Sequence, residues 1–422
     1  MIKSLKIETG WQRTQMIAAC LLCLTLIFFF VRWCFGDTIA ARAPVREVAE
    51  WSIDLAPNDP QTHYALAVLT EKSFAPEDLA KSLVEYERAV ALAPHDYRLW
   101  LALGKARERG GDATGAELAL RKSLEIAPNY AQVQWTLGNA LLRRGNVAEA
   151  FAQMAQAAEN HPDYRLPTVN TAWQIFEGDL EAVRRHLGGS VNINFALASF
   201  LAKQKRFTEA VQIWNALPVE SKNTIYKADG EQLLAEMLTA KKYREALRIR
   251  QTVGDQPEGA GYASGKIFNG GFETALARDK ADVFDWRIAD GAQPQIGLNS
   301  ERKHDGNASL FFIFNSADGR GFRAVSQTVV VESERKYTLE FFYRAELKTS
   351  ATLRWEITDA ADGKVLASAA PISGSTDWTN ANAEFTTAAA TEAIIIRLVR
   401  AECQSSICPI SGKVWFDDFQ LR

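Results

Sequence analysis

The chain has 422 residues, a formal net charge of -3, 47% hydrophobic residues and 23% charged residues. This length allows two or three domains, and the composition is that of folded globular material rather than of a disordered chain. The small negative charge, and the lack of a basic stripe interleaved with aromatic residues, argue against a nucleic-acid-binding protein.

The first expected element is a membrane-spanning helix at residues 14–35. The stretch from Met16 to Val31 carries no charged residue, and with its flanks it reaches about the 20 residues that a span requires. Trp11 and Trp33 bracket it, as aromatic residues do at membrane interfaces.

The charges before this helix predict its orientation. Residues 1–13 contain three basic residues against a single acidic one, Glu8. The positive-inside tendency therefore places residues 1–13 in the cytoplasm and the remaining chain in the periplasm, as a single-pass protein of the inner (cytoplasmic) membrane. The alternative is a cleaved signal peptide with Ala41-Arg42-Ala43 at the cleavage site, which Pro44 in the next position disfavours.

Residues 44–253 are expected to form helical repeats, because residue types recur at a spacing of 34. The recurring positions are Pro94, Pro128 and Pro162; Gly104 and Gly138; Gly111 and Gly145; Ala116 and Ala150; Tyr130 and Tyr164. The region resembles a tetratricopeptide array, in which each unit is a helical hairpin. The glycines and alanines let the two helices approach closely, and the proline stops the second helix. One hairpin cannot bury its apolar side, so the units should stack into a solenoid whose concave face binds a protein partner.

Two parts of this region depart from the period. The unit that ends at Pro94 is three residues too long, and we place the surplus in the turn around Ser73 to Glu77. After two regular units the signature weakens: Thr168 to Leu187 is helical in pattern without it, and it returns around Ala210 and Ala246. Degenerate units are expected at the ends of a stack, where they cap it.

Residues 254–265 are rich in glycine and break the helical period, which indicates a linker. From 266 to 422 the period changes to two, and short β-branched or aromatic runs alternate with turn residues. The expected strands are 310–314, 322–331, 337–344, 351–358, 393–399 and 413–421. This pattern predicts an antiparallel β-sandwich.

Several short motifs in residues 266–422 support a more specific comparison. They are Asn269-Gly270-Gly271-Phe272-Glu273, Asp285-Trp286, Gly306 with Ser309-Leu310, Gln327, Asp377-Trp378-Thr379 and Trp415-Phe416-Asp417-Asp418-Phe419. In their order and spacing the region resembles the jelly-roll carbohydrate-binding modules of families four and nine and the wider galactose-binding-like sandwiches. The expected fold is therefore multidomain: a transmembrane helix, an all-α tetratricopeptide solenoid and an all-β jelly-roll sandwich.

The resemblance also implies a structural calcium ion. In such modules the opening glutamate and the aspartate of the last strand meet at calcium, and the matching positions here are Glu273, with the Gly271 carbonyl, and Asp417. Calcium takes about six to eight oxygen ligands, so carboxylates from the first and last strands suit it. Alternation predicts that Asp417 points inward and Asp418 outward. The alternative is that Glu273 and Asp417 cap turns or pair with arginines.

A glycan site needs an aromatic platform with polar groups around it. Alternation in the expected strands, with one loop residue added, gives a candidate concave groove whose charge suits an anionic glycan. Its residues are Trp286, Phe342, Arg344, Arg354, Glu356 and Arg397. The other interpretation is that Trp355 belongs to the core and the charged residues form cross-strand ion pairs on a solvated sheet.

Cys403 and Cys408 are separated by four residues just before the last expected strand. This spacing brings two Cα atoms within reach of a disulfide, and an exported domain meets an oxidising compartment where such a bond persists. The alternative is a pair of free thiols, as in a cytoplasmic domain.

No catalytic site is expected. The five histidines are scattered without metal-ligand spacing or a nearby nucleophile, and the sequence has no phosphate loop or dinucleotide fingerprint. The sequence thus predicts a non-enzymatic envelope scaffold that binds protein through the repeats and a glycan through the sandwich, in export or assembly of a surface polysaccharide. The alternative is a pure protein-assembly factor whose sandwich binds no sugar.

Overall fold

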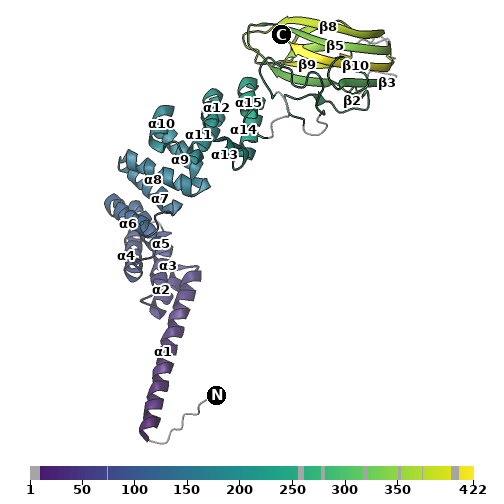
Figure 1. Cartoon of the computed structure of the whole chain (residues 1–422). Helices are drawn as coiled ribbons and strands as arrows, with labels where there is room; N and C mark the ends of the chain where they lie inside the picture. Colours follow the sequence, from purple (N-terminus) through teal and green to yellow (C-terminus); the bar gives the residue numbers. More distant parts are fainter. Residues whose placement is uncertain are drawn as a thin grey trace. The chain divides into compact units, whose positions relative to one another are not determined.

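The chain is divided into two compact units. The computed structural model describes residues 10–422 except 74, 255–260, 277–280, 317–321, 350–352, 373 and 401–407. One unit ends at Ala196 and the other runs from Leu197 to Arg422. The boundary falls within helix α11 (Val191–Lys203), and Figure 1 shows the elements of both units in chain order.

Helix α1 (Gly10–Arg42) contains the predicted membrane span. Within it, Arg13–Arg42 is long and apolar enough to cross a membrane, as an anchor or as a signal sequence, and an 18-residue stretch of it has a mean hydropathy of 2.4. The end of α1 packs on helices α2 (Arg46–Leu55) and α3 (Pro60–Glu71). A Cβ added to Gly36 would lie 2.5 Å from the Cβ of Ala56. The last turns of α1 are therefore part of the core of the first unit.

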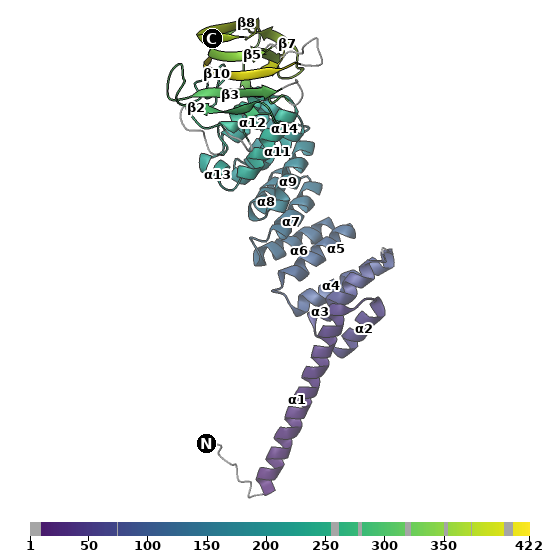
Figure 2. The ribbon, with the colours of Figure 1, turned by 90° about the vertical axis from the view of Figure 1, so that its right-hand side faces the viewer.

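The predicted helical repeats are confirmed in the first unit. After α3 its helices are α4 (Pro76–Leu92), α5 (Tyr97–Arg109), α6 (Ala113–Ile126), α7 (Ala131–Arg143), α8 (Val147–Asn160), α9 (Arg165–Ile175) and α10 (Leu180–Leu187), with a 3-10 turn at Pro162–Tyr164. The pairs α3 with α4, α5 with α6, and α7 with α8 are helical hairpins, and Figure 2 shows them one after another.

Each regular hairpin is held by a close helix crossing. A Cβ on Gly104 would lie 2.6 Å from the Cγ of Leu120, and one on Gly138 would lie 3.0 Å from the carbonyl oxygen of Ala150. The alanine of the second helix at each crossing is fully buried. These positions therefore accept only the small residues that the period places there.

The prediction for the three surplus residues of the first full unit is wrong. The distance along the chain from the start of α3 to the start of α4 equals that from α5 to α6. The surplus instead lengthens α4, which has 17 residues, whereas α6 and α8 have 14 each. The extra residues continue the helical hydrogen bonding rather than leaving backbone groups unpaired in a longer loop.

The proline that ends each early unit has a second role. Its carbonyl oxygen pairs with the side chain six residues later, on the next helix, at 2.7–2.9 Å. These contacts join Pro57 with His63 Nε2, Pro94 with Trp100 Nε1, and Pro128 with Gln134 Nε2. The side chain differs in every unit, so the period of 34 does not reveal this contact.

The second unit begins with helices and ends with the sandwich. After α11 its helices are α12 (Phe207–Asn215), α13 (Val219–Asn223), α14 (Lys227–Thr239) and α15 (Tyr243–Arg250). Ala210 and Ala246, which mark the weak returning repeats in the sequence, are both fully buried.

In the described residues, the sandwich consists of two antiparallel five-stranded sheets. Their orders are β1-β4-β9-β6-β7 and β2-β3-β10-β5-β8, and Figure 2 shows the second from β8 to β2. The strands are β1 (Arg287–Ile288), β2 (Gln295–Asn299), β3 (Ser309–Ser316), β4 (Val325–Val330), β5 (Lys336–Thr349), β6 (Leu353–Asp359), β7 (Val365–Ser368), β8 (Ser375–Thr386), β9 (Ala393–Arg400) and β10 (Ile410–Leu421). All six expected strands are present.

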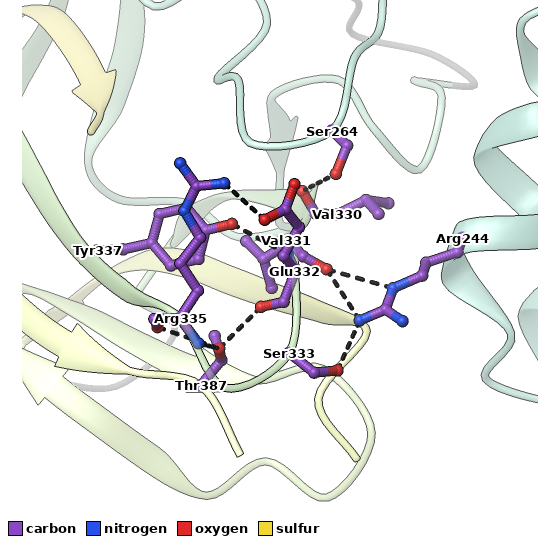
Figure 3. A network of polar contacts seen from close by, with 9 residues as sticks. All are labelled: Arg244, Ser264, Val330, Val331, Glu332, Ser333, Arg335, Tyr337 and Thr387. Atoms are coloured by element: carbon purple, nitrogen blue, oxygen red, sulfur yellow. Dashed lines mark hydrogen bonds and ion pairs between the residues drawn. The ribbon is translucent and has the colours of Figure 1, made fainter. Parts of the chain in front are cut away.

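Helix α15 is tied directly to the sandwich by Arg244 (Figure 3). Its guanidinium donates to the carbonyl oxygens of Val331 and Thr391 at 3.2–3.4 Å and to the Ser333 hydroxyl at 2.6 Å. The neighbouring Tyr243 hydroxyl donates to the Ala360 carbonyl at 3.0 Å. The helices before the predicted linker and the sandwich after it therefore also contact each other directly through these side chains.

The hairpin crossing gives a direct test. Gly138→Val would place a branched side chain against the Ala150 carbonyl and Met154, so we expect a loss of about 1–3 kcal/mol in the free energy of unfolding. Denaturant titration of the full chain in detergent, followed by helical circular dichroism, measures this. Gly189→Ala is the control, since an added Cβ there meets no atom closer than 3.9 Å. Equal stability of the two variants would contradict the close-crossing account.

Candidate functional site

The predicted glycan groove does not form as one surface. Phe342 and Arg344 lie on β5, whereas Arg354, Glu356 and Arg397 lie on β6 and β9 of the other sheet. The core lies between the two sheets, so these two groups occupy opposite outer faces of the sandwich. Sequence alternation assigns a residue to a face of its own sheet, but it does not say which strands share a sheet.

Trp286 belongs to neither face. It is fully buried in the sandwich core, with ring centroids 5.3 Å from Phe272 and 5.8 Å from Trp355. Its indole N–H donates to the Asn269 carbonyl oxygen at 3.1 Å, which satisfies the polar end of the ring. The prediction that Trp286 joins a glycan site is therefore wrong.

The β5 face carries the aromatic surface. His304 stacks on Phe342 with centroids 3.7 Å apart and planes 11° apart, and its ring lies 5.7 Å from Trp378 of β8. Arg344 pairs with Asp377 at the same end of β8. Next to these groups, Asn380 is an exposed amide opposite Phe342 in the strand pairing. The sequence motifs include Trp378, but alternation alone does not bring His304 to it, because His304 comes from a loop.

The opposite face carries a charged cluster. Glu356 accepts hydrogen bonds from Arg354 at 2.7 Å and from Arg397 at 3.2 Å, and its side chain is 9% exposed. Burial acts to raise the pKa of Glu356, but the two arginines outweigh it and hold the pKa below its ordinary value. The pair of Glu356 with Arg397 is the cross-strand ion pairing that the sequence offers as the other interpretation, whereas Arg354 lies on the same strand as Glu356. Trp355 is in the core, as that interpretation states.

The carboxylates proposed for calcium hold one loop. Glu273 accepts from the Asn307 backbone N–H at 2.8 Å and from its side-chain amide at 2.7 Å. Asp417 accepts from the backbone N–H groups of His304 at 2.9 Å and Asp305 at 3.3 Å. Across the described part of the chain, no group of three or more His, Cys, Asp or Glu side chains is placed to hold a metal ion. In this geometry the two carboxylates bind loop amides, and calcium stays a prediction.

Asp417 lies on the outer side of its sheet, contrary to the predicted inward direction. It pairs with Phe342, and a bulge between Asp417 and Gln420 shifts the alternation so that Phe416 and Phe419 both reach the core. The loop that contains His304 covers Asp417, which is fully buried. Burial raises its pKa to about 6, against the lowering effect of the His304 and Asp305 amides. A cation beside such a carboxylate would favour its ionised form.

The structure describes only one of the two cysteines of the predicted disulfide. Cys408 is disulfide-bonded, and Cys403 lies outside the described residues. The pairing of these two cysteines therefore stays a prediction.

The helical repeats of the first unit contain two open hollows. One, of about 340 Å³, is lined by tyrosine and basic side chains from α3, α4, α5 and the start of α7. The second, of about 420 Å³, lies between α5, α7 and Tyr164. Lys105 and Gln132 line both hollows, so the two hollows adjoin each other, and we call them together the groove. The sequence predicts a binding face on the repeats, but it does not identify these side chains.

The calcium prediction has a direct test. A ligand bound only by the native state stabilises it by mass action, so a chelator should lower the melting temperature of the sandwich transition in the full chain, and added calcium should restore it. Glu273→Gln and Asp417→Asn should each remove this sensitivity, whereas Asp377→Asn, on the exposed strand β8, should keep it. An unchanged transition after chelation would mean that the two carboxylates only hold the loop.

The comparisons with known proteins match parts of the chain. Among solved structures it is similar to one described as "CBM4 structure and function" (15% identity, 37% of this chain and 97% of that chain, TM-score 0.28). It is also similar to TmCBM61 in complex with β-1,4-galactotriose (18%, 38% and 99%, 0.27) and to MamA from Desulfovibrio magneticus RS-1 (16%, 37% and 90%, 0.30). No curated protein matches the sequence. Residues 77–131 match the family model for the tetratricopeptide repeat, so this stretch of the chain is a tetratricopeptide repeat region.

Proposed function

We propose that the chain is a non-enzymatic scaffold, anchored in the membrane by α1, that binds a protein through its helical repeats and a glycan through its sandwich. The observation that carries this proposal is the open groove along the tetratricopeptide repeats, because such repeats are protein-interaction elements. Hydrogen bonds from loop amides occupy Glu273 and Asp417, and arginines occupy Glu356. In this proposal these carboxylates therefore have a structural role and not a catalytic one.

The proposed setting is a bacterial-type envelope. The excess of basic residues before α1 supports an N-terminus in the cytoplasm, with the repeats and the sandwich in the periplasm. The packing of the end of α1 against α2 and α3 supports an anchor that stays attached, since cleavage after Ala43 would remove Ala40 from the core of the first unit. The proposed process is export or assembly of a surface polysaccharide, because it would need a protein-binding surface and a glycan-binding surface on one chain at this membrane.

The proposed glycan surface is the β5 face, made of His304, Phe342, Arg344 and Trp378. It is the face on which aromatic rings and polar groups occur together, as a sugar ring requires. Arg344 adds a cation that suits a carboxylate-bearing sugar. A second candidate is a pure protein-assembly factor, and the stacking of His304 over Phe342 favours it, because one ring face of Phe342 is then already covered.

Titration of the full chain in nanodiscs with neutral and acidic polysaccharides distinguishes the two functions. For the polysaccharide that binds best, Trp378→Ala should weaken affinity about tenfold, because a stacked ring and its buried area are lost. Arg344→Gln should weaken the affinity for an acidic polysaccharide by a similar factor. Arg354→Gln is the matched control, since it removes the same charge from the opposite face.

Two outcomes would contradict the glycan assignment. Absence of binding to every neutral and acidic polysaccharide would favour the pure assembly factor. Loss of binding with Arg354→Gln but not with Arg344→Gln would move the site to the β6 and β9 face.

A further inference from the structure

The groove on the first unit has a distinct chemical character. It is lined mainly by the first helices of successive units, and Tyr86 of α4 joins them. Leu101 and Ala102 of α5 add apolar side chains to the tyrosine rings of the first hollow. Tyr97 and Tyr130 have ring centroids 4.8 Å apart, and at the other end Trp135 lies 5.5 Å from Tyr164. The groove therefore runs along a series of aromatic rings.

Lys105 lies where the two hollows meet, and its charge has no carboxylate partner among the residues that the structure describes. Burial and the nearby Arg109 both lower the pKa of Lys105. A partly desolvated ammonium group gains more from an incoming carboxylate than a fully hydrated one does, because its hydration is already reduced. This cation is the position in the groove that most favours an anion.

The carboxylates near the groove are already neutralised. Glu71 pairs with Arg109 and accepts from the Tyr86 hydroxyl at 3.0 Å. Two further pairs lie along the groove, Asp96 with Arg98 and Glu108 with Arg143. Each acidic side chain is thus matched by an arginine, and Lys105 gives the groove its excess positive charge.

We propose that this groove binds an acidic, extended polypeptide segment, with a glutamate or aspartate carboxylate on Lys105 and neighbouring side chains against the tyrosine rings. The proposal rests on the proposed scaffold function and names the chemistry of its protein partner. Two hollows on either side of one lysine suit a chain that presents side chains on both sides of the anchoring carboxylate. Trp135 and Gln132 line the second hollow and offer an apolar ring and an amide to such a segment.

A fluorescent peptide of alternating glutamate and valine is the probe, because valine favours an extended backbone and offers a side chain to the tyrosine rings. It should bind the full chain in nanodiscs at low salt, whereas the same peptide with glutamine in place of glutamate should bind at least about tenfold more weakly. Lys105→Gln should reduce the affinity for the acidic peptide about tenfold, and Lys105→Arg should retain most of it. Lys122→Gln is the matched control, because Lys122 of α6 pairs with Glu125 and does not line the groove.

Three results would overturn the proposal: equal affinity for the glutamate and glutamine peptides, equal effects of Lys105→Gln and Lys122→Gln, or binding of a polyuronate at this groove in place of the peptide. Circular dichroism melting of each variant confirms that it is folded. A capture experiment distinguishes failure of the acidic-segment proposal from failure of the scaffold function. Envelope proteins are captured with the wild-type chain and again with Lys105→Gln. Capture that Lys105→Gln leaves unchanged would contradict the acidic-segment proposal alone, and absence of any captured partner would contradict the scaffold function.

Discussion

The close crossing of the two helices in each hairpin is the constraint on which the first unit depends. At Gly104 and Gly138 the neighbouring atoms already fill the space of a Cβ, so the two helices of each hairpin pack at a fixed distance. The first helices of these hairpins line the groove. The same device recurs at the membrane end, where Gly36 of α1 lies against Ala56. The end of the apolar helix and the groove thus belong to one packed unit.

The second unit depends on polar contacts that the helices and the sandwich make with each other. Arg244 satisfies carbonyl oxygens at one end of the sheets, and the Lys242 ammonium pairs with Glu392 at 3.0 Å. At another part of the sandwich, Glu273 and Asp417 hold the loop that carries His304 to the β5 face. The carboxylates that resemble calcium ligands and the aromatic surface proposed for glycan binding are therefore linked through one loop, so a cation beside Asp417 would also fix the position of His304.

The sequence predicts most of the fold because its strongest signals are local and periodic. The spacing of 34 identifies the helix crossings, and alternation identifies six strands. Strands β1, β2, β7 and β8 were not expected, and in β8 exposed polar residues such as Asn380 and Asn382 obscure the apolar alternation. The candidate site is less predictable, since it depends on which strands share a sheet and on a bulge that reverses the direction of Asp417. Some turns are also missed because their residue type changes between units. Lys205 and Lys241 adopt φ values of 61° and 59° at turns where the earlier units have glycine.

The proposed function depends on one placement, in which α1 anchors the chain and its repeats and sandwich lie outside the cytoplasm. The proposed surface polysaccharide and the predicted disulfide both depend on that placement, because both belong to the extracytoplasmic side. The most direct measurement fuses after Arg422 a reporter enzyme that is active only outside the cytoplasm, with a second fusion at the same position of a reporter active only inside. We expect activity of the first reporter alone in the membrane fraction. Activity of the second reporter alone would contradict the orientation and, with it, the proposed envelope function.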